Sequence, residues 1–241
     1  MWLSALRIVL GPALLWQGAQ VRRRILRMPE AYGPRQGGAE DPGALSVLFL
    51  GDSSIAGVGA PTQHQALSGR LIHRLSRHWP DIAWRVLGTT GWTTEDALEA
   101  LGTLPEHRYD IVVISLGVND VTTETDPATW LDTYDRLLDR LTDRFGTRLT
   151  IVSGLPPMGR FPALPQPLRW YLGLRASANE AALFQRHEDR PNTVCLPLVF
   201  DLDPTAMAED GFHPGPGVYD AWAALVADAI VPRLKDLTET P

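Results

Sequence analysis

Cysteine is almost absent from this chain: the 241 residues include one, Cys195. No internal disulfide can form, so nothing in the composition calls for an oxidising compartment. Cys195 lies in the apolar run 194–196, where a buried core position is a simpler interpretation than a nucleophile.

Basic residues are also few, with 22 Lys and Arg against 28 Asp and Glu, which gives a net charge of −6. Proteins that bind nucleic acids gather Lys and Arg on one face to contact phosphates, so we expect no nucleic-acid partner. The exception is a short basic cluster, Arg22-Arg23-Arg24 with Arg27.

Several motifs that bind cofactors or carry out catalysis are missing. The chain has no Walker A loop, no Gly-x-Gly-x-x-Gly at a strand end, no His-Glu-x-x-His and no Gly-x-Ser-x-Gly of the common α/β-hydrolases. Apart from His213, the histidines show no ligand-like pairing; they are at positions 64, 73, 78, 107 and 187. We therefore expect no metal dependence.

A long uninterrupted apolar run is missing as well. Residues 2–18 are mostly apolar but include Arg7, Gly11 and Pro12, and the basic cluster follows this run instead of preceding it. That order, without an Ala-x-Ala-like site, does not predict a cleavable signal peptide, and the run is short for a transmembrane helix. Residues 1–28 are thus interpreted as a helix packed on the domain, a helix on a membrane surface or a marginal anchor, the first two being favoured.

The rest of the chain divides into a linker and one domain. Residues 29–44 are rich in Pro, Gly and charge and predict a linker, and residues 45–241 form the expected catalytic domain. The expected location is cytoplasmic or peripheral on a membrane, and the oligomeric state is left open.

From residue 45 onward, strand-like and helix-like patterns alternate. Strands are expected at 45–50, 82–87, 111–116, 149–153 and 193–196. Helices are expected at 66–78, 93–101, 127–145, 169–187 and 217–234. This alternation predicts an α/β protein with a parallel sheet of about five strands covered on both faces.

Ser53 lies at the end of the first of these strands. The run 47–50 is apolar and rich in β-formers, and it stops at Gly51-Asp52-Ser53. Ligands of open α/β sheets bind beyond the carboxyl ends of the strands, so the Ser53 hydroxyl is expected at a ligand site. The ordinary alternative is a strand-ending turn, because Gly, Asp and Ser are common turn residues.

Three further groups lie in loops that follow apolar runs. Gly91 follows the second strand, Asn119 follows the third, and Asp210 and His213 precede the last helix. Each has an ordinary explanation as a turn, a cap or a surface histidine, but together they supply the parts for acyl transfer. His213 could take the proton of Ser53 with Asp210 orienting its ring. The amides of Ser53, Gly91 and Asn119 could stabilise an oxyanion.

In this order, the motifs resemble the four signature blocks of the SGNH (GDSL-type) hydrolases. The blocks are Gly51-Asp52-Ser53, Gly91, Gly117-x-Asn119-Asp120 and Asp210-x-x-His213. The resemblance implies a three-layer α/β/α flavodoxin-like sandwich without metal or cofactor. It also implies Ser53, Asp210 and His213 as the catalytic triad, and Ser53, Gly91 and Asn119 as the oxyanion hole. The chain departs from the family at Ser54, where leucine is usual.

The proline-rich segment 155–170 is expected to form an apolar wall beside this site. Its substrate-binding candidates are Met158, Phe161, Leu164 and Trp170, although a purely structural loop is the alternative.

Together, the motifs and this segment predict a serine esterase for carboxylic esters, with short to medium acyl or aryl esters favoured. Lysophospholipase, thioesterase and carbohydrate deacetylase activities remain open, and a non-catalytic membrane-associated binding protein is the alternative from another class.

Overall fold

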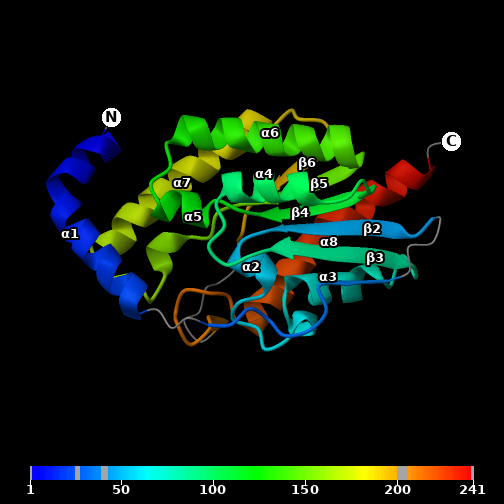
Figure 1. Ribbon diagram of the computed structural model, residues 1–241, viewed down its shortest axis with the longest axis horizontal. Helices are drawn as coiled ribbons and strands as arrows, with labels where there is room; N and C mark the ends of the chain where they lie inside the picture. The colour runs from blue at the N-terminus through cyan, green and yellow to red at the C-terminus, as the bar shows by residue number, and fades with distance from the viewer. Residues whose placement is uncertain (1, 25–27, 39–42, 200–205, 240–241) are drawn as a thin grey trace.

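Five parallel strands form the middle of the molecule, with helices on both faces (Figure 1). The computed structural model describes residues 2–24, 28–38, 43–199 and 206–239. The strands are β1 (Gln36–Gly37), β2 (Leu45–Gly51), β3 (Ile82–Gly88), β4 (Ile111–Ser115), β5 (Leu149–Ser153) and β6 (Thr193–Leu196). Their order across the sheet is β1-β3-β2-β4-β5-β6, so β2 lies between β3 and β4. The expected α/β sandwich with a parallel sheet is confirmed.

The helices alternate with the strands as their apolar spacing predicts. They are α1 (Trp2–Arg24), α2 (Ser53–Ala56), α3 (Leu67–Leu75), α4 (Thr94–Thr103), α5 (Val118–Thr122), α6 (Pro127–Phe145), α7 (Leu168–His187) and α8 (Pro216–Glu239). Two short 3-10 turns, η1 (Gln63–Gln65) and η2 (Met158–Arg160), lie in the loops. The sequence patterns missed the short elements α2 and α5 because one helical turn has no periodicity to detect.

Strand β2 is buried along its whole length, and its side chains alternate between two apolar clusters. Leu48 and Leu50 belong to the cluster that includes α4 and α6, whereas Val47 and Phe49 belong to the cluster that includes α3 and α8. Burial on both faces is typical of a central parallel strand. It fixes the register of β2 and therefore the position of the residues that follow it.

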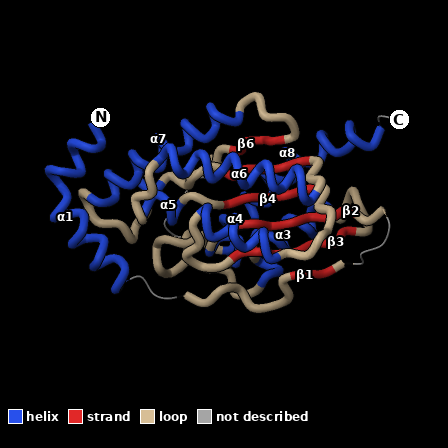
Figure 2. Tube along the Cα trace, turned by 45° about the horizontal axis from the view of Figure 1, so that its top comes forward, coloured by secondary structure: helices blue, strands red, loops and turns tan. Residues whose placement is uncertain are grey.

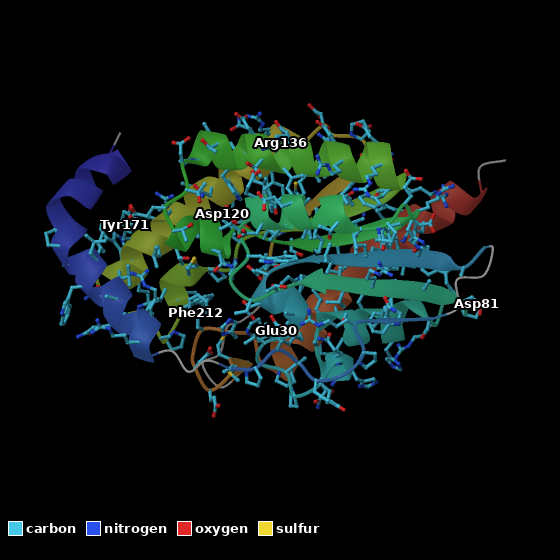
Figure 3. The ribbon with its side chains drawn as sticks, in the orientation of Figure 1. Glu30, Asp81, Asp120, Arg136, Tyr171 and Phe212 are labelled. Atoms are coloured by element: carbon cyan, nitrogen blue, oxygen red, sulfur yellow. The ribbon has the colours of Figure 1, made fainter. Side chains whose placement is uncertain are left out.

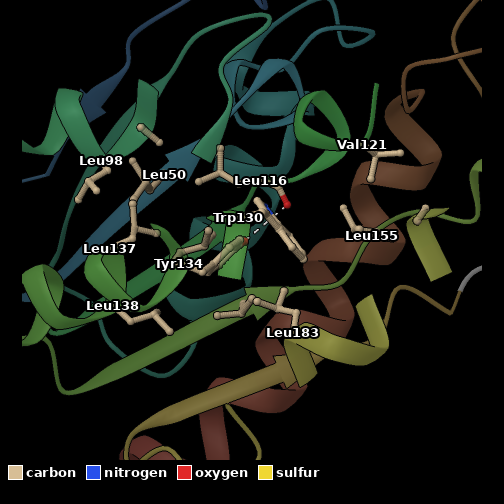
Figure 4. Close-up of a cluster of buried hydrophobic side chains, with 14 of the residues drawn as sticks. Leu50, Leu98, Leu116, Val121, Trp130, Tyr134, Leu137, Leu138, Leu155 and Leu183 are labelled. Atoms are coloured by element: carbon tan, nitrogen blue, oxygen red, sulfur yellow. Dashed lines mark hydrogen bonds between the residues drawn. The ribbon is translucent and has the colours of Figure 1, made fainter. Parts of the chain in front are cut away.

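Helix α6 supplies the largest side chains of one cluster. Trp130, Tyr134, Leu137 and Leu138 are all at most 1% exposed, and Figure 4 shows them together with Leu50 of β2. The helix begins at an Asp126 cap, which accepts a hydrogen bond from the Thr129 amide, and it ends at a left-handed glycine. These caps set where the Trp130 ring enters the core.

Helix α1 packs on α7, at the end of the molecule toward which β2 and β3 run (Figure 1). Leu14 is 6% exposed, and the Gln17 side chain bonds to the backbone of Gln166 and Leu168 at 2.6 and 3.0 Å. Residues 1 and 25–27 of the predicted segment 1–28, including Arg27, lie outside the described residues. Within the described part of the chain, no helix is both long enough and apolar enough to cross a membrane.

The structure corrects the prediction that residues 29–44 are a linker. Gln36 and Gly37 form β1, which pairs antiparallel with β3 at one edge of the sheet (Figure 2). Strand β1 has no signal in the sequence, because a polar residue followed by a glycine has no strand pattern. Residues 39–42 of the predicted linker lie outside the described residues.

Candidate active site

Ser53 is the first residue of α2 and directly follows the turn that ends β2. Asp52 caps α2, with its carboxylate accepting a hydrogen bond from the Ser54 amide. Glycine is needed at position 51, because a Cβ there would lie 2.2 Å from the carbonyl oxygen of Ser115 on β4. The chain can therefore turn tightly against β4 and hold the Ser53 hydroxyl at the carboxyl end of the central strand.

His213 links Ser53 to Asp210. The His213 Nε2 atom lies 3.1 Å from the Ser53 Oγ, and its Nδ1 atom lies 2.6 Å from Asp210 Oδ2. The other carboxylate oxygen, Oδ1, accepts hydrogen bonds from the amides of Phe212 and His213 at 2.9 and 3.0 Å. The structure thus brings together the three residues of the predicted triad in hydrogen-bond contact.

The Asp210 carboxylate is held in its charged form. Its side chain is fully buried, which by itself raises the pKa, but hydrogen bonds from the His213 ring and from two backbone amides outweigh burial and lower the pKa. A charged Asp210 accepts a hydrogen bond from the Nδ1–H group of His213. The Nε2 lone pair then faces Ser53, so this arrangement can take a proton from the hydroxyl.

The two other predicted oxyanion donors follow the strands on either side of β2. Gly91 follows β3, and Asn119 lies in α5, after β4. Gly91 has φ of +91°, with open space where a side chain would be. The Asn119 amide donates one hydrogen bond to the Trp92 carbonyl at 2.8 Å, which ties its loop to that of Gly91.

A buried network strengthens the link between these loops. Asp120, 2% exposed, accepts hydrogen bonds from the Thr94 amide and hydroxyl, at 3.1 and 2.9 Å. Trp130 of α6 in turn donates its indole N–H to the Thr94 hydroxyl at 2.9 Å. Figure 3 labels Asp120 near the end of the sheet where the parallel strands finish. The sequence motif includes Asp120, but its contact with Thr94 joins two separate loops and has no signal in the sequence.

Glu30, within the predicted linker, braces the Gly91 loop from the other side. Its Oε1 accepts hydrogen bonds from the Thr90 amide and hydroxyl at 2.8 and 2.9 Å, and its Oε2 pairs with Arg35. Arg35 also donates to the Gly88 carbonyl at 2.7 Å. The segment before β2 therefore helps to position the loop that holds Gly91, a role that no sequence pattern indicated.

Asp52 and Ser54 form a second buried polar group behind the nucleophile position. The Ser54 hydroxyl lies 2.9 Å from Asp52 Oδ1 and 2.8 Å from the Ser115 hydroxyl. Burial raises the pKa of Asp52 to about 6, although the hydrogen bonds from Ser54 oppose this rise. Position 54 is usually leucine in the family that the motifs resemble. Here Ser54 donates hydrogen bonds to the buried Asp52 carboxylate.

A small pocket of about 50 Å³ opens beside Ser53 and His213. Its polar lining includes Ser54 and Ser115. Its apolar lining consists of Val118, Pro156, Phe161, Leu198, Met207, Phe212, Pro214, Val218 and Trp222. The volume is small compared with typical ligand pockets of about 300 to 1,000 Å³.

Of the four substrate-binding candidates in segment 155–170, only Phe161 lines this pocket. Its ring meets the Phe212 ring edge-on at 5.1 Å, next to His213. The structure corrects the prediction for the other three. Met158 and Leu164 are buried in the core, and Trp170 is 43% exposed on α7. Helical phase turns Trp170 outward, and the sequence around it does not show which face of α7 is covered.

The residues of the site show no arrangement suited to a metal. Among the described residues, no group of three or more His, Cys, Asp or Glu side chains is placed to hold a metal ion. Cys195 is partly buried within the sheet, and burial raises its pKa to about 11, so its thiol is a poor nucleophile at neutral pH.

A comparison with protein families completes this picture. The model of the GDSL-like lipase/acylhydrolase family matches residues 49–221, which include Ser53, Asp210 and His213. The chain belongs to this family. The resemblance drawn from the four motifs is thereby confirmed, and the protein is a GDSL-family hydrolase of the esterase, lipase and acylhydrolase group. No curated protein matched the chain.

Solved structures of a lipase, of TesA and of a carbohydrate esterase share the fold. The lipase Lip_vut3 from a goat rumen metagenome is 18% identical with a TM-score of 0.62, covering 78% of this chain and 98% of that one. TesA is 21% identical with a TM-score of 0.61 and the same coverage. A carbohydrate esterase of family 3 from Talaromyces cellulolyticus is 17% identical with a TM-score of 0.60, covering 80% and 99%. At these identities the likeness shows the fold alone.

The network around Asp120 predicts a specific kinetic defect. Asp120→Asn removes one of the acceptors for Thr94 and loosens the loops of Gly91 and Asn119. We expect kcat for p-nitrophenyl acetate to fall by about tenfold or more with little change in KM, since loss of an oxyanion donor costs roughly 100-fold to 1,000-fold. The matched control is Asp126→Asn, because Asp126 accepts the same two kinds of hydrogen bond from Thr129 at the start of α6. Equal kcat values for both variants would contradict the positioning role.

The raised pKa of Asp52 predicts how stability changes with pH. An aspartate in an unfolded chain has a pKa of about 3.9. Between about pH 4 and pH 7 the folded protein keeps this proton longer than the unfolded chain, so rising pH removes stability, on the order of 3 kcal/mol. Asp52→Asn lacks this titration. The free energy of unfolding in urea, measured at both pH values, should rise for the variant relative to wild type as the pH rises. A difference in unfolding free energy that does not change with pH would contradict the raised pKa of Asp52.

Proposed function

We propose that the protein is a serine esterase that hydrolyses carboxylic esters through an acyl-enzyme on Ser53. The observation that carries this proposal is the chain of contacts from Asp210 through His213 to the Ser53 hydroxyl, at 2.6 and 3.1 Å. A binding protein has no use for a nucleophile, a base and an orienting carboxylate in line. This argues against the non-catalytic alternative.

In the first half of the proposed reaction, the Ser53 oxygen attacks the ester carbonyl carbon while its proton passes to His213 Nε2. The carbonyl oxygen becomes an oxyanion, for which the amides of Ser53, Gly91 and Asn119 are the proposed donors. The bond from the carbonyl carbon to the alcohol oxygen then breaks, and His213 gives its proton to the departing alcohol. Asp210 stays charged and stabilises the imidazolium that forms.

In the second half, water replaces the alcohol. It gives one proton to His213 as its oxygen attacks the acyl carbon of Ser53. The tetrahedral intermediate collapses when the bond to the Ser53 oxygen breaks, and His213 returns the proton to that oxygen. A carboxylic acid leaves, and the enzyme regains its starting state without metal or cofactor.

The pocket beside Ser53 supports short acyl groups as the preferred substrates. Its volume of about 50 Å³ gives room for only a few non-hydrogen atoms. Phe161, Phe212 and Trp222 surround this space with apolar surface. An acetyl or similarly short acyl ester fits this description, including an acetyl group carried by a carbohydrate. Long acyl chains, as in a lysophospholipase or a thioesterase, need an extension of the pocket.

The test is turnover of a p-nitrophenyl ester series, from acetate to palmitate, by wild type and Ser53→Ala. We expect the highest kcat/KM at acetate to butyrate and a loss of at least about a thousandfold in kcat in the variant, because triad members act as a unit. The matched control is Ser46→Ala, which removes a buried serine at the opposite end of β2 and should keep near-normal turnover.

Two results would contradict the proposal. Near-normal turnover by Ser53→Ala would remove Ser53 from the reaction. A peak at long chains would contradict the short-acyl preference while leaving the esterase mechanism in place.

A further inference from the structure

One face of helix α1 packs on the domain. Leu10, Leu14 and Val21 contribute to the same apolar cluster as α6 and α7, and they recur at helical spacing. Gln17 lies on this face and bonds through both atoms of its side-chain amide to backbone groups of Gln166 and Leu168. The helix is thereby fixed in its rotation about its own axis, and this determines which residues point outward.

The outward face is also apolar. Leu15 is 71% exposed and Trp16 is 62% exposed, and Ala13 beside them is exposed as well. Such side chains on an otherwise well-packed protein mark an interaction surface when they lie together. Trp170, 43% exposed, is in the first turn of α7, next to the residues that Gln17 contacts. No residue from Leu10 to Val21 is charged.

A pair of exposed arginines follows this apolar face. Arg22 and Arg23 lie in the last turn of α1, and Arg23 is two helical turns beyond Trp16 on the same side of the helix. A helix on which apolar residues and tryptophan are followed by arginines is typical of helices that lie in the interface of a membrane. There the arginines contact anionic headgroups. The chain as a whole has a net charge of −6, so this attraction is local to α1.

The charges favour a lipid surface over a second copy of the chain. A second copy would offer the arginines of this face no carboxylate, because residues 10–24 include no Asp or Glu, and an apolar contact confined to one helix face is small for a stable dimer. An anionic bilayer instead accepts the apolar side chains and pairs with the arginines in the same contact.

We propose that the outward face of α1, formed by Ala13, Leu15, Trp16, Arg22 and Arg23, binds the protein to anionic membranes. Helix α1 lies beyond the end of the sheet toward which β2 and β3 run, so the bound protein would have its candidate active site near the lipid surface (Figure 1). The position of the site depends on the proposed function, whereas membrane binding does not.

Binding of the full chain to vesicles tests this proposal. Sedimentation with phosphatidylcholine vesicles that contain phosphatidylglycerol is compared with sedimentation with pure phosphatidylcholine vesicles. We expect wild type to bind the anionic vesicles. The double variant Arg22→Gln/Arg23→Gln should bind about thirtyfold more weakly, from the contribution of each arginine near an anionic surface. Leu15→Ser/Trp16→Ser should reduce binding by at least about tenfold.

The matched control is Tyr32→Ser, since Tyr32 is 83% exposed and belongs to the segment that pairs with Thr62 instead of to α1. It should bind as wild type does. All variants should keep wild-type turnover of a soluble ester, which shows that they are folded and separates failure of this proposal from failure of the proposed function.

Three results would overturn the proposal. Wild type could fail to bind anionic vesicles. The two α1 variants could bind as tightly as wild type. Sedimentation velocity could show a dimer that Leu15→Ser/Trp16→Ser abolishes while no vesicle is bound, which would make the face an interface between copies.

Discussion

The hydrogen bond between His213 and Ser53 joins two residues that are 160 positions apart, and the rest of the site depends on it. On one side, burial of β2 on both faces and the tight turn at Gly51 fix Ser53. On the other side, Asp210 holds the His213 ring through one carboxylate oxygen and the backbone of its loop through the other. A carboxylate that accepts three hydrogen bonds stays charged, and its contact with Nδ1–H holds the ring in the tautomer whose Nε2 lone pair faces Ser53.

Buried polar contacts hold the surrounding loops in place. Asp120 and Thr94 join the loops after β3 and β4, and Trp130 anchors this pair to the core below. Glu30 holds Thr90 on the far side of the Gly91 loop. A donor that is positioned before the reaction needs no reorganisation when the oxyanion forms. These contacts tie the loops after β3 and β4 to each other, to the core and to the segment before β2.

Much of the fold and the centre of the site could be predicted from the sequence. Apolar runs predict the five parallel strands, four of which end at Gly or Ser, and the ordered motifs identify Ser53, Asp210 and His213. Strand β1 was not predictable, because pairing with β3 and not its own composition makes Gln36 a strand residue. The direction of Trp170 depends on how α7 is covered. The size of the pocket depends on how closely Phe161 approaches Phe212, a distance between loops far apart in the chain.

Covalent labelling tests the central claim most directly. Wild type is incubated with an aryl alkylphosphonate ester, which traps a serine nucleophile, and the modified residue is located by mass spectrometry of the intact protein and its peptides. The account predicts one adduct, on Ser53, because among the described side chains its hydroxyl is the one that bonds to the His213 Nε2 atom. An adduct on the neighbouring Ser54, whose hydroxyl bonds to Asp52 instead, or no adduct on any residue, would contradict it.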